Sequence, residues 1–191
     1  MLVDALQFLL NTFINLLTLI FLLRFFMQLF KAPFNNPLGQ MVMTLSNFAV
    51  KPLRRFLPSV GKIDVSTLLL AVLAQFLLQY CLILLRGYPL ALAGQPAWLG
   101  LIGLSFLGVV KTALDVFFYA LLLQVILSWV NPFSTIAGVL DSLTRPILVP
   151  IRRFIPTAGG IDFSPMVAII IIQMLHISVI ANIEQQLKAF F

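Results

Sequence analysis

Charged residues are scarce in this chain. They make up 9% of its 191 residues, whereas hydrophobic residues make up 61%. A soluble globular domain usually carries about 25% charged residues, because water must solvate its surface. So few charges cannot cover a water-soluble fold of this length. The composition therefore predicts a protein that lies in a lipid bilayer.

Cysteine and histidine are nearly absent as well. The single cysteine, Cys81, rules out an intramolecular disulfide and a cysteine-based metal site. The single histidine, His176, has no other ligand residue at metal-binding spacing, so we expect no metal. No nucleophile, base and acid form a recognisable set. We therefore expect neither a cofactor nor an enzymatic activity.

The net charge is +6, but the basic residues are few and are embedded in apolar sequence. The sequence contains no run of alternating basic and aromatic residues of the kind that follows a phosphate backbone. The charge is instead typical of contact with anionic lipid headgroups. We therefore expect membrane lipids as partners, and no nucleic acid.

One segment of the chain occurs twice. The second copy, Pro150 to Pro165, reads PIRRFIPTAGGIDFSP, and the first copy, Pro52 to Ser66, reads PLRRFLPSVGKIDVS. The two copies lie about 98 residues apart and align without a gap, which indicates an internal repeat. We therefore predict two tandem units, residues 1–90 and 97–191.

Four apolar stretches are long enough to cross a membrane, at about residues 5–30, 65–85, 114–130 and 165–183. A helix of about 20 apolar residues spans a hydrocarbon core of about 30 Å. The predicted fold is an all-α polytopic membrane protein with four transmembrane helices in two tandem two-helix repeats. The apolar segment Trp98 to Val110 is either an extension of the third helix or a separate interfacial or re-entrant element.

Two connectors, residues 31–63 and 131–163, are too polar to span the bilayer. We expect each to form an amphipathic helix that lies in the membrane interface. Guanidinium groups there could set the topology, bind an anionic lipid or a partner protein, or form the mouth of an ion pathway. The candidate lipid-binding or partner-binding residues are Arg54, Arg55, Arg145, Arg152 and Arg153.

The basic residues also predict an orientation. Because cytoplasmic loops carry an excess of Lys and Arg, both connectors should face the cytoplasm. Two crossings separate them, so both termini should then be periplasmic. Arg24 lies near the end of the first apolar stretch, and we expect its side chain to reach the headgroups.

Polar residues recur inside the predicted spans. Asn11 and Asn15 share one face of the first helix, and Gln75 and Gln173 occupy equivalent positions near mid-membrane in the two repeats. Such groups either form hydrogen bonds between helices or line a polar cavity or permeation path. Lys111 and Asp115, four residues apart, could form an ion pair.

The repeated Gly-Ile-Asp-x-Ser motif precedes a transmembrane helix in each half. Its acidic and hydroxyl residues are predicted to cap these helices at their N-termini. The carboxylates could instead pair with the nearby arginines or take part in binding a cation. The residues concerned are Asp64, Ser66, Asp162 and Ser164.

The second half of the chain resembles the YggT family. The matching motifs are Asn131-Pro132-Phe133, Thr144-Arg145-Pro146, and the repeated segment from Pro150 to Pro165. The resemblance covers the whole chain as two tandem units. In the first half of the chain, Lys62, Val65 and Thr67 stand where the second half has Gly160, Phe163 and Pro165. Whether both halves do the same job is therefore open.

The resemblance implies a multi-pass protein of the bacterial inner membrane that is tied to osmotic or extracytoplasmic stress, without an agreed molecular activity. Two functions are compatible with the residues. The first is a membrane scaffold or stress-response factor that engages lipids, further copies of itself or membrane-protein partners. The alternative is an oligomeric channel or transporter for ions or osmolytes.

Overall fold

We describe the chain from a computed structural model that places residues 1–90, 94–131, 134–155 and 162–191. These residues form helices and no strand. Four helical segments are long and apolar enough to cross a membrane: α1 (Leu2–Leu29), α3 (Val65–Leu85), α4 (Gly94–Val130) and the continuous run Ser164–Lys188. This confirms an all-α, multi-pass membrane protein.

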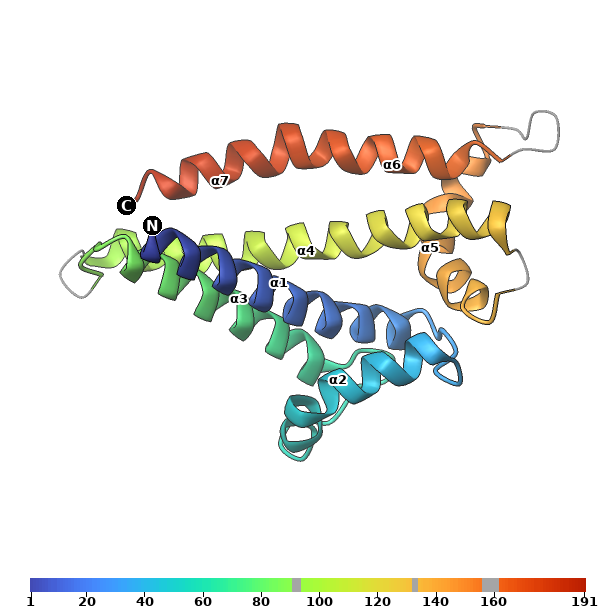
Figure 1. The fold of residues 1–191 in the computed structure, drawn as a ribbon, viewed down its shortest axis with the longest axis horizontal. Coiled ribbons are helices and arrows are strands. Elements are labelled where there is room, and N and C mark those ends of the chain that lie inside the picture. The colour runs from blue at the N-terminus through green and yellow to red at the C-terminus, as the bar shows by residue number, and fades with distance from the viewer. Residues whose placement is uncertain (91–93, 132–133, 156–161) are drawn as a thin grey trace.

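The fourth spanning segment has three parts. It begins as α6 (Ser164–Met174), passes through a π-helical turn, η1 (Leu175–Ile180), and ends as α7 (Ala181–Lys188). The fourth span, predicted to end at about residue 183, therefore continues to Lys188. The segment packs mainly against α4 and lies apart from α1 and α3 (Figure 1).

The third spanning segment, α4, is one unbroken helix of 37 residues. Trp98 to Val110 is thus an extension of the third helix, which decides between the alternatives that the sequence left open. At 1.5 Å per residue α4 is about 55 Å long, well beyond a hydrocarbon core of about 30 Å. It touches every other helical segment except α2, so it links the two halves of the bundle.

The two connectors contain the helices α2 (Pro37–Arg54) and α5 (Ala137–Arg152). Asn36 caps α2, because its side chain accepts a hydrogen bond from the Gly39 amide at 2.9 Å. One face of each helix is buried: α2 packs against α1 and α3, and α5 packs against α4, α6 and α1.

Both connector helices lie at one end of the bundle, and both termini lie at the other (Figure 1). This arrangement follows from an even number of crossings between the connectors. We call these the connector end and the terminal end. The motif residues Pro132, Phe133, Pro156 and 159–161 lie outside the described residues.

Large apolar side chains cover the outer surface of the spanning helices. Phe13 is 72% exposed and Ile177 is 75% exposed. A protein surrounded by water would not expose side chains of this size over several helices. The apolar outer surface is therefore the part of the molecule that faces lipid, and polar groups gather inside the bundle or at its ends.

Candidate functional sites at the connector end and inside the bundle

The repeated motif forms the same ion pair in both halves. Arg54 lies against the carboxylate of Asp64, and Arg152 lies 2.8 Å from the carboxylate of Asp162 through Nη2. In each case the first arginine of the Arg-Arg pair contacts the aspartate ten residues later. The alternative that the sequence left open, pairing between the aspartates and the arginines, is what the structure shows.

The two ion pairs differ in burial. Asp64 is fully buried, and Arg54 also donates a hydrogen bond to Gln28 Oε1 at 2.9 Å. The side chain of Asp162 is 28% exposed. Partial burial by itself would raise the pKa of Asp162, but hydrogen bonds from Ser164 and Arg152 outweigh it and hold that pKa below its usual value.

The capping prediction is mostly wrong, and the ion pairs explain why. The Asp64 side chain forms no cap hydrogen bond because its carboxylate is turned toward Arg54. Ser66 donates instead to the Leu57 carbonyl at 2.6 Å. Ser164 is the first residue of α6 and not its cap. Asp162 does accept a hydrogen bond from the Ser164 amide, at 2.9 Å, in addition to its contact with Arg152.

The second arginine of each pair faces outward. Arg55 and Arg153 are exposed, and the described residues provide no ion-pair partner for either. The phenylalanine that follows is also exposed, 82% for Phe56 and 85% for Phe154. The other candidate, Arg145, is exposed and lies 4.0 Å from Asp141.

Arg24 does not reach the headgroups as predicted. It is 6% exposed, and its Nη1 donates hydrogen bonds to Ser46 Oγ at 2.6 Å and to Asn47 Oδ1 at 3.0 Å. Both partners belong to α2, which covers this part of α1. A buried guanidinium needs such partners, so Arg24 fastens the first connector helix to the bundle.

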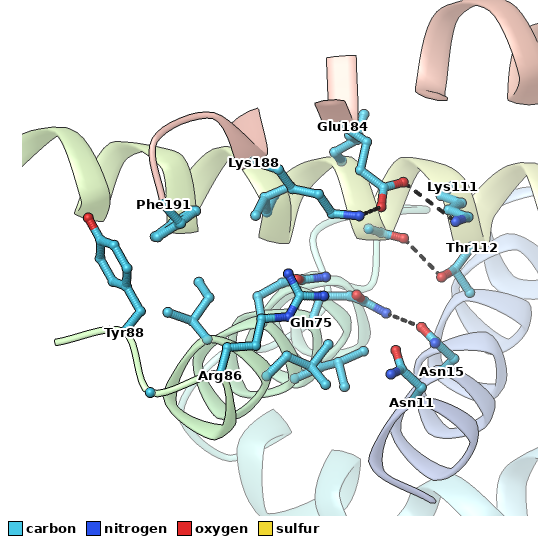
Figure 2. A pocket seen from close by; sticks show the side chains of 18 of the residues that line it. Asn11, Asn15, Gln75, Arg86, Tyr88, Lys111, Thr112, Glu184, Lys188 and Phe191 are labelled. Atoms are coloured by element: carbon cyan, nitrogen blue, oxygen red, sulfur yellow. Dashed lines mark hydrogen bonds and ion pairs between the residues drawn. The ribbon is translucent and has the colours of Figure 1, made fainter. Parts of the chain in front are cut away.

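A second cluster of polar residues surrounds a cavity inside the bundle. The cavity has a volume of about 660 Å³ and lies between α1, α3, α4 and α7 (Figure 2). Its lining runs from Arg86 and Tyr88 at the terminal end to Gln75 halfway along α3. Asn11 and Asn15 also line it, so the polar face predicted on the first helix does border a cavity.

Gln75 forms the deep end of this cavity. It is 1% exposed, and its Nε2 donates to Asn15 Oδ1 at 2.8 Å and lies 3.2 Å from Thr18 Oγ1. Its carbonyl end lies so close to Gly108 that a β-carbon there would collide with it. The predicted hydrogen bonding between helices is therefore confirmed for Gln75, which joins α1, α3 and α4.

The equivalent residue of the second repeat behaves differently. Gln173 is exposed on α6, and the described residues give it no hydrogen-bond partner. The reason lies in the packing, because α6 contacts α4 and α5 but not α3. A shared position in the repeat thus does not give a shared contact.

Ion pairs cross between α4 and the fourth spanning segment. Lys111 Nζ lies 3.7 Å from Glu184 Oε2, and Glu184 also pairs with Lys188 (Figure 2). Asp115 lies 3.7 Å from His176 Nε2. The predicted Lys111–Asp115 pair is thus wrong, since each residue has a nearer partner on the opposite helix.

Sequence reasoning missed these partners. Glu184 and Lys188 are four residues apart, which is a signal for a pair on one helical face, but they lie beyond the predicted end of the fourth span at about residue 183. Within the described residues no three His, Cys, Asp or Glu side chains gather closely enough to hold a metal ion.

The cavity is closed toward the connector end by apolar side chains. Phe21 and Leu22 of α1, Ala71 of α3 and Val116 of α4 form one buried cluster on that side of Gln75. On α1 and α3 the apolar cluster follows the polar lining, whereas on α4 the lining residues Lys111 and Asp115 lie between Val109 and Val116 of the cluster. The cavity therefore reaches into the bundle from the terminal half, and between α1 and α3 it ends near Gln75.

Comparison with known proteins places the chain in a family. The family model described as CCB3/YggT matches residues 3–85 and again residues 104–183. These two matches are consistent with the tandem repeat. No solved structure matches the chain.

Several curated relatives cover nearly the whole chain. An uncharacterized protein of Pseudomonas aeruginosa is 37% identical over 96% of this chain and 95% of its own length. The uncharacterized protein YggT of Escherichia coli K12 is 37% identical over 92% of this chain and 89% of its own length. An uncharacterized protein of Haemophilus influenzae is 34% identical over 87% of this chain and 86% of its own length. The chain therefore belongs to the CCB3/YggT family.

Proposed function

We propose that this protein is a non-enzymatic scaffold of the bacterial inner membrane. It engages anionic lipids through the C-terminal ends of its two connector helices, α2 and α5. One observation carries the proposal. The repeat presents an exposed Arg-Phe pair twice at the same end of the bundle, as Arg55-Phe56 and Arg153-Phe154. In each copy the preceding arginine is held by an aspartate of the same motif.

The two arginines of each motif differ in their contacts, and this difference supports a lipid contact. If both arginines only marked the cytoplasmic side, neither would need a fixed place. Arg54 and Arg152 instead fix the end of each connector helix, which leaves Arg55 and Arg153 in defined positions beside an exposed aromatic ring. A guanidinium group binds phosphate oxygens, and a phenylalanine ring inserts among acyl chains. An anionic phospholipid supplies both.

In this proposal the connector end faces the cytoplasm and the termini face the periplasm, because the connectors carry most of the basic residues.

The scaffold acts in osmotic or extracytoplasmic stress, through lipids and through partners that are further copies of the chain or other membrane proteins. The stress role is an expectation from the family resemblance. Loss of growth at high osmolarity on deletion, restored by the wild-type gene, is the expected result; unimpaired growth contradicts this part of the proposal.

The lipid contact is tested by lipid retention. The protein is purified in mild detergent after mixing with phosphatidylglycerol, and the lipids that remain bound are counted by native mass spectrometry. We expect the double variant Arg55→Gln/Arg153→Gln to retain markedly fewer lipids than the wild type.

The matched control is Lys31→Gln/Lys51→Gln, which removes the same charge from exposed positions at the same end. Equal retention by wild type and the arginine variant overturns the proposal. So does an equal loss in the lysine control, because the effect would then be one of net charge alone.

A channel or transporter for ions or osmolytes is the second candidate, and the polar cavity lined by Asn11 and Asn15 favours it. The apolar cluster around Phe21 and Ala71 closes this cavity toward the connector end, so transport requires a rearrangement or an oligomer. Its test is potassium and sodium flux into liposomes that hold the purified protein. Flux that disappears in Asn11→Leu, with folding unchanged, would establish it, and absence of flux in several lipid compositions would contradict it.

A further inference from the structure

We propose that the cavity between α1, α3, α4 and α7 binds a small organic anion, namely a phosphate or carboxylate that also carries hydroxyl groups. This inference goes beyond lipid contact at the connector ends. It concerns the opposite half of the bundle and uses none of the same residues (Figure 2).

The charges that line the cavity do not balance. Lys111 and Lys188 share one carboxylate, Glu184. The other carboxylate, Asp115, lies against His176. This leaves Arg86, which is exposed to the cavity and has no ion-pair partner among the described residues. Among the side chains that line the cavity, three cations therefore face two carboxylates, and the excess is positive.

The excess lies at the mouth of the cavity and attracts an anion into it. Arg86 ends α3 at the terminal end and is exposed, whereas Lys111 lies about halfway along α4. A cleft that carries an excess of one charge between low-dielectric walls raises the local concentration of counter-ions. A bound anion supplies the missing partner. Its acidic group would lie between Arg86 and the two lysines.

The size of the cavity excludes a bare inorganic ion as a good fit. Ligand sites for small organic molecules measure about 300–1,000 Å³, and this cavity measures about 660 Å³. A phosphate or carboxylate alone would leave most of the space to water. The ligand must therefore carry further groups beyond the one that the cations bind.

The remaining polar lining indicates what those groups are. The side-chain amides of Asn11, Asn15 and Gln79 line the cavity. Asn15 uses its Oδ1 to accept from Gln75, and its Nδ2 donates no hydrogen bond to the described residues. Amides both donate and accept, which suits hydroxyl groups. Gln75 is held in place by hydrogen bonds to Asn15 and Thr18, so the deep end is already organised.

This chemistry has two sources. One is a free solute that enters from the terminal end, past Arg86 and Tyr88. The other is the headgroup of an anionic phospholipid that enters sideways. A second hollow of about 190 Å³ between α1 and α4 shares Asn15, Thr112 and Asp115 with the cavity. Glycerol phosphate is common to both sources.

The test for a free solute uses the full chain in nanodiscs made only of phosphatidylcholine. Glycerol 3-phosphate is titrated in and its binding is measured by calorimetry. Saturable binding is expected, and Arg86→Gln should weaken it about tenfold or more, because a charged hydrogen bond is lost. The matched control is Lys51→Gln, which removes the same charge from α2 at the connector end.

The test for a lipid source uses nanodiscs that contain phosphatidylglycerol, with lipid retention counted by mass spectrometry. Retention that falls in Arg86→Gln but not in Lys51→Gln assigns the site to a headgroup. Gln79→Leu is a second variant, because it removes an amide and leaves every charge in place. It should weaken binding in whichever of the two experiments shows binding to the wild type. Absence of saturable binding in both arms overturns the proposal, as does equal weakening by Lys51→Gln.

Discussion

Arg54 lies against a fully buried Asp64, whereas their counterparts in the second repeat, Arg152 and Asp162, meet where solvent reaches them. The same sequence motif therefore produces the same contact in two environments. The environment decides how much free energy of unfolding is lost when the contact is broken, because a buried charge that loses its partner cannot be solvated.

Removal of the arginine should consequently cost more in the first repeat. Arg54→Gln leaves the Asp64 carboxylate buried without its counter-ion, which costs about 3–5 kcal/mol in other proteins. Arg152→Gln leaves a carboxylate that water can reach, and about 1 kcal/mol or less is expected. The measurement is unfolding in mixed micelles of increasing denaturing detergent. Arg54→Gln/Asp64→Asn should recover much of the loss, and equal effects of the two single variants would contradict the difference in burial.

The hydrogen bonds that Asp162 accepts from Ser164 and Arg152 should make stability depend on pH in the acid range. The pKa of Asp162 is lowered in the folded protein. Its contribution is therefore fully present above the unfolded value of about 3.9 and is lost as the pH falls through the lowered pKa. Melting temperatures of wild type and Asp162→Asn should differ by a constant amount above about pH 5 and converge in stronger acid. A difference in melting temperature that grows as the pH falls would contradict the predicted direction of the pH dependence.

Arg24 gives a test of how the first connector helix is attached. Both hydrogen bonds come from Arg24 Nη1, which lies one bond farther along the side chain than a lysine ammonium would. Lysine is also a strongly hydrated point charge on a flexible stem, so it is a poor replacement at this buried position. Arg24→Lys should therefore speed hydrogen exchange of the α2 amides, by about tenfold if one charged hydrogen bond is lost. Exchange in α3 should stay unchanged and serves as the internal control. If Arg24 reached the headgroups, lysine would replace it without effect.

The sequence predicted the spanning helices well, because long apolar runs and the proline-rich breaks between them depend on local chemistry. The second span, predicted at about residues 65–85, agrees with α3, and the continuity of α4 was one of the predicted alternatives. The repeated motif also suggested, as one alternative, that Asp64 and Asp162 pair with nearby arginines, and the structure shows both pairs.

Partners across helices could not be predicted in the same way. The packing of the fourth spanning segment on α4 decides that Lys111 meets Glu184 and that Asp115 meets His176. Helical spacing within α4 favoured a pair between Lys111 and Asp115 instead. Gln75 and Gln173 occupy equivalent positions, yet only the first helix pair is packed closely enough to bury such a group. Contacts of this kind depend on tertiary structure, which the spacing of residues in one chain does not contain.

Gly108 provides a test of the deep end of the cavity. A β-carbon at this position would collide with the side-chain amide of Gln75, which is buried and hydrogen-bonded to Asn15. Gly108→Ala should therefore displace Gln75 and lower stability by about 1–3 kcal/mol, measured by detergent unfolding. Gly103→Ala is the matched control on the same helix, because its new methyl group meets the end of the flexible Leu187 side chain. Gln75→Ala should relieve the collision, so Gly108→Ala should cost little in that background. A full cost in both backgrounds would show that Gly108 is needed for a reason other than contact with Gln75.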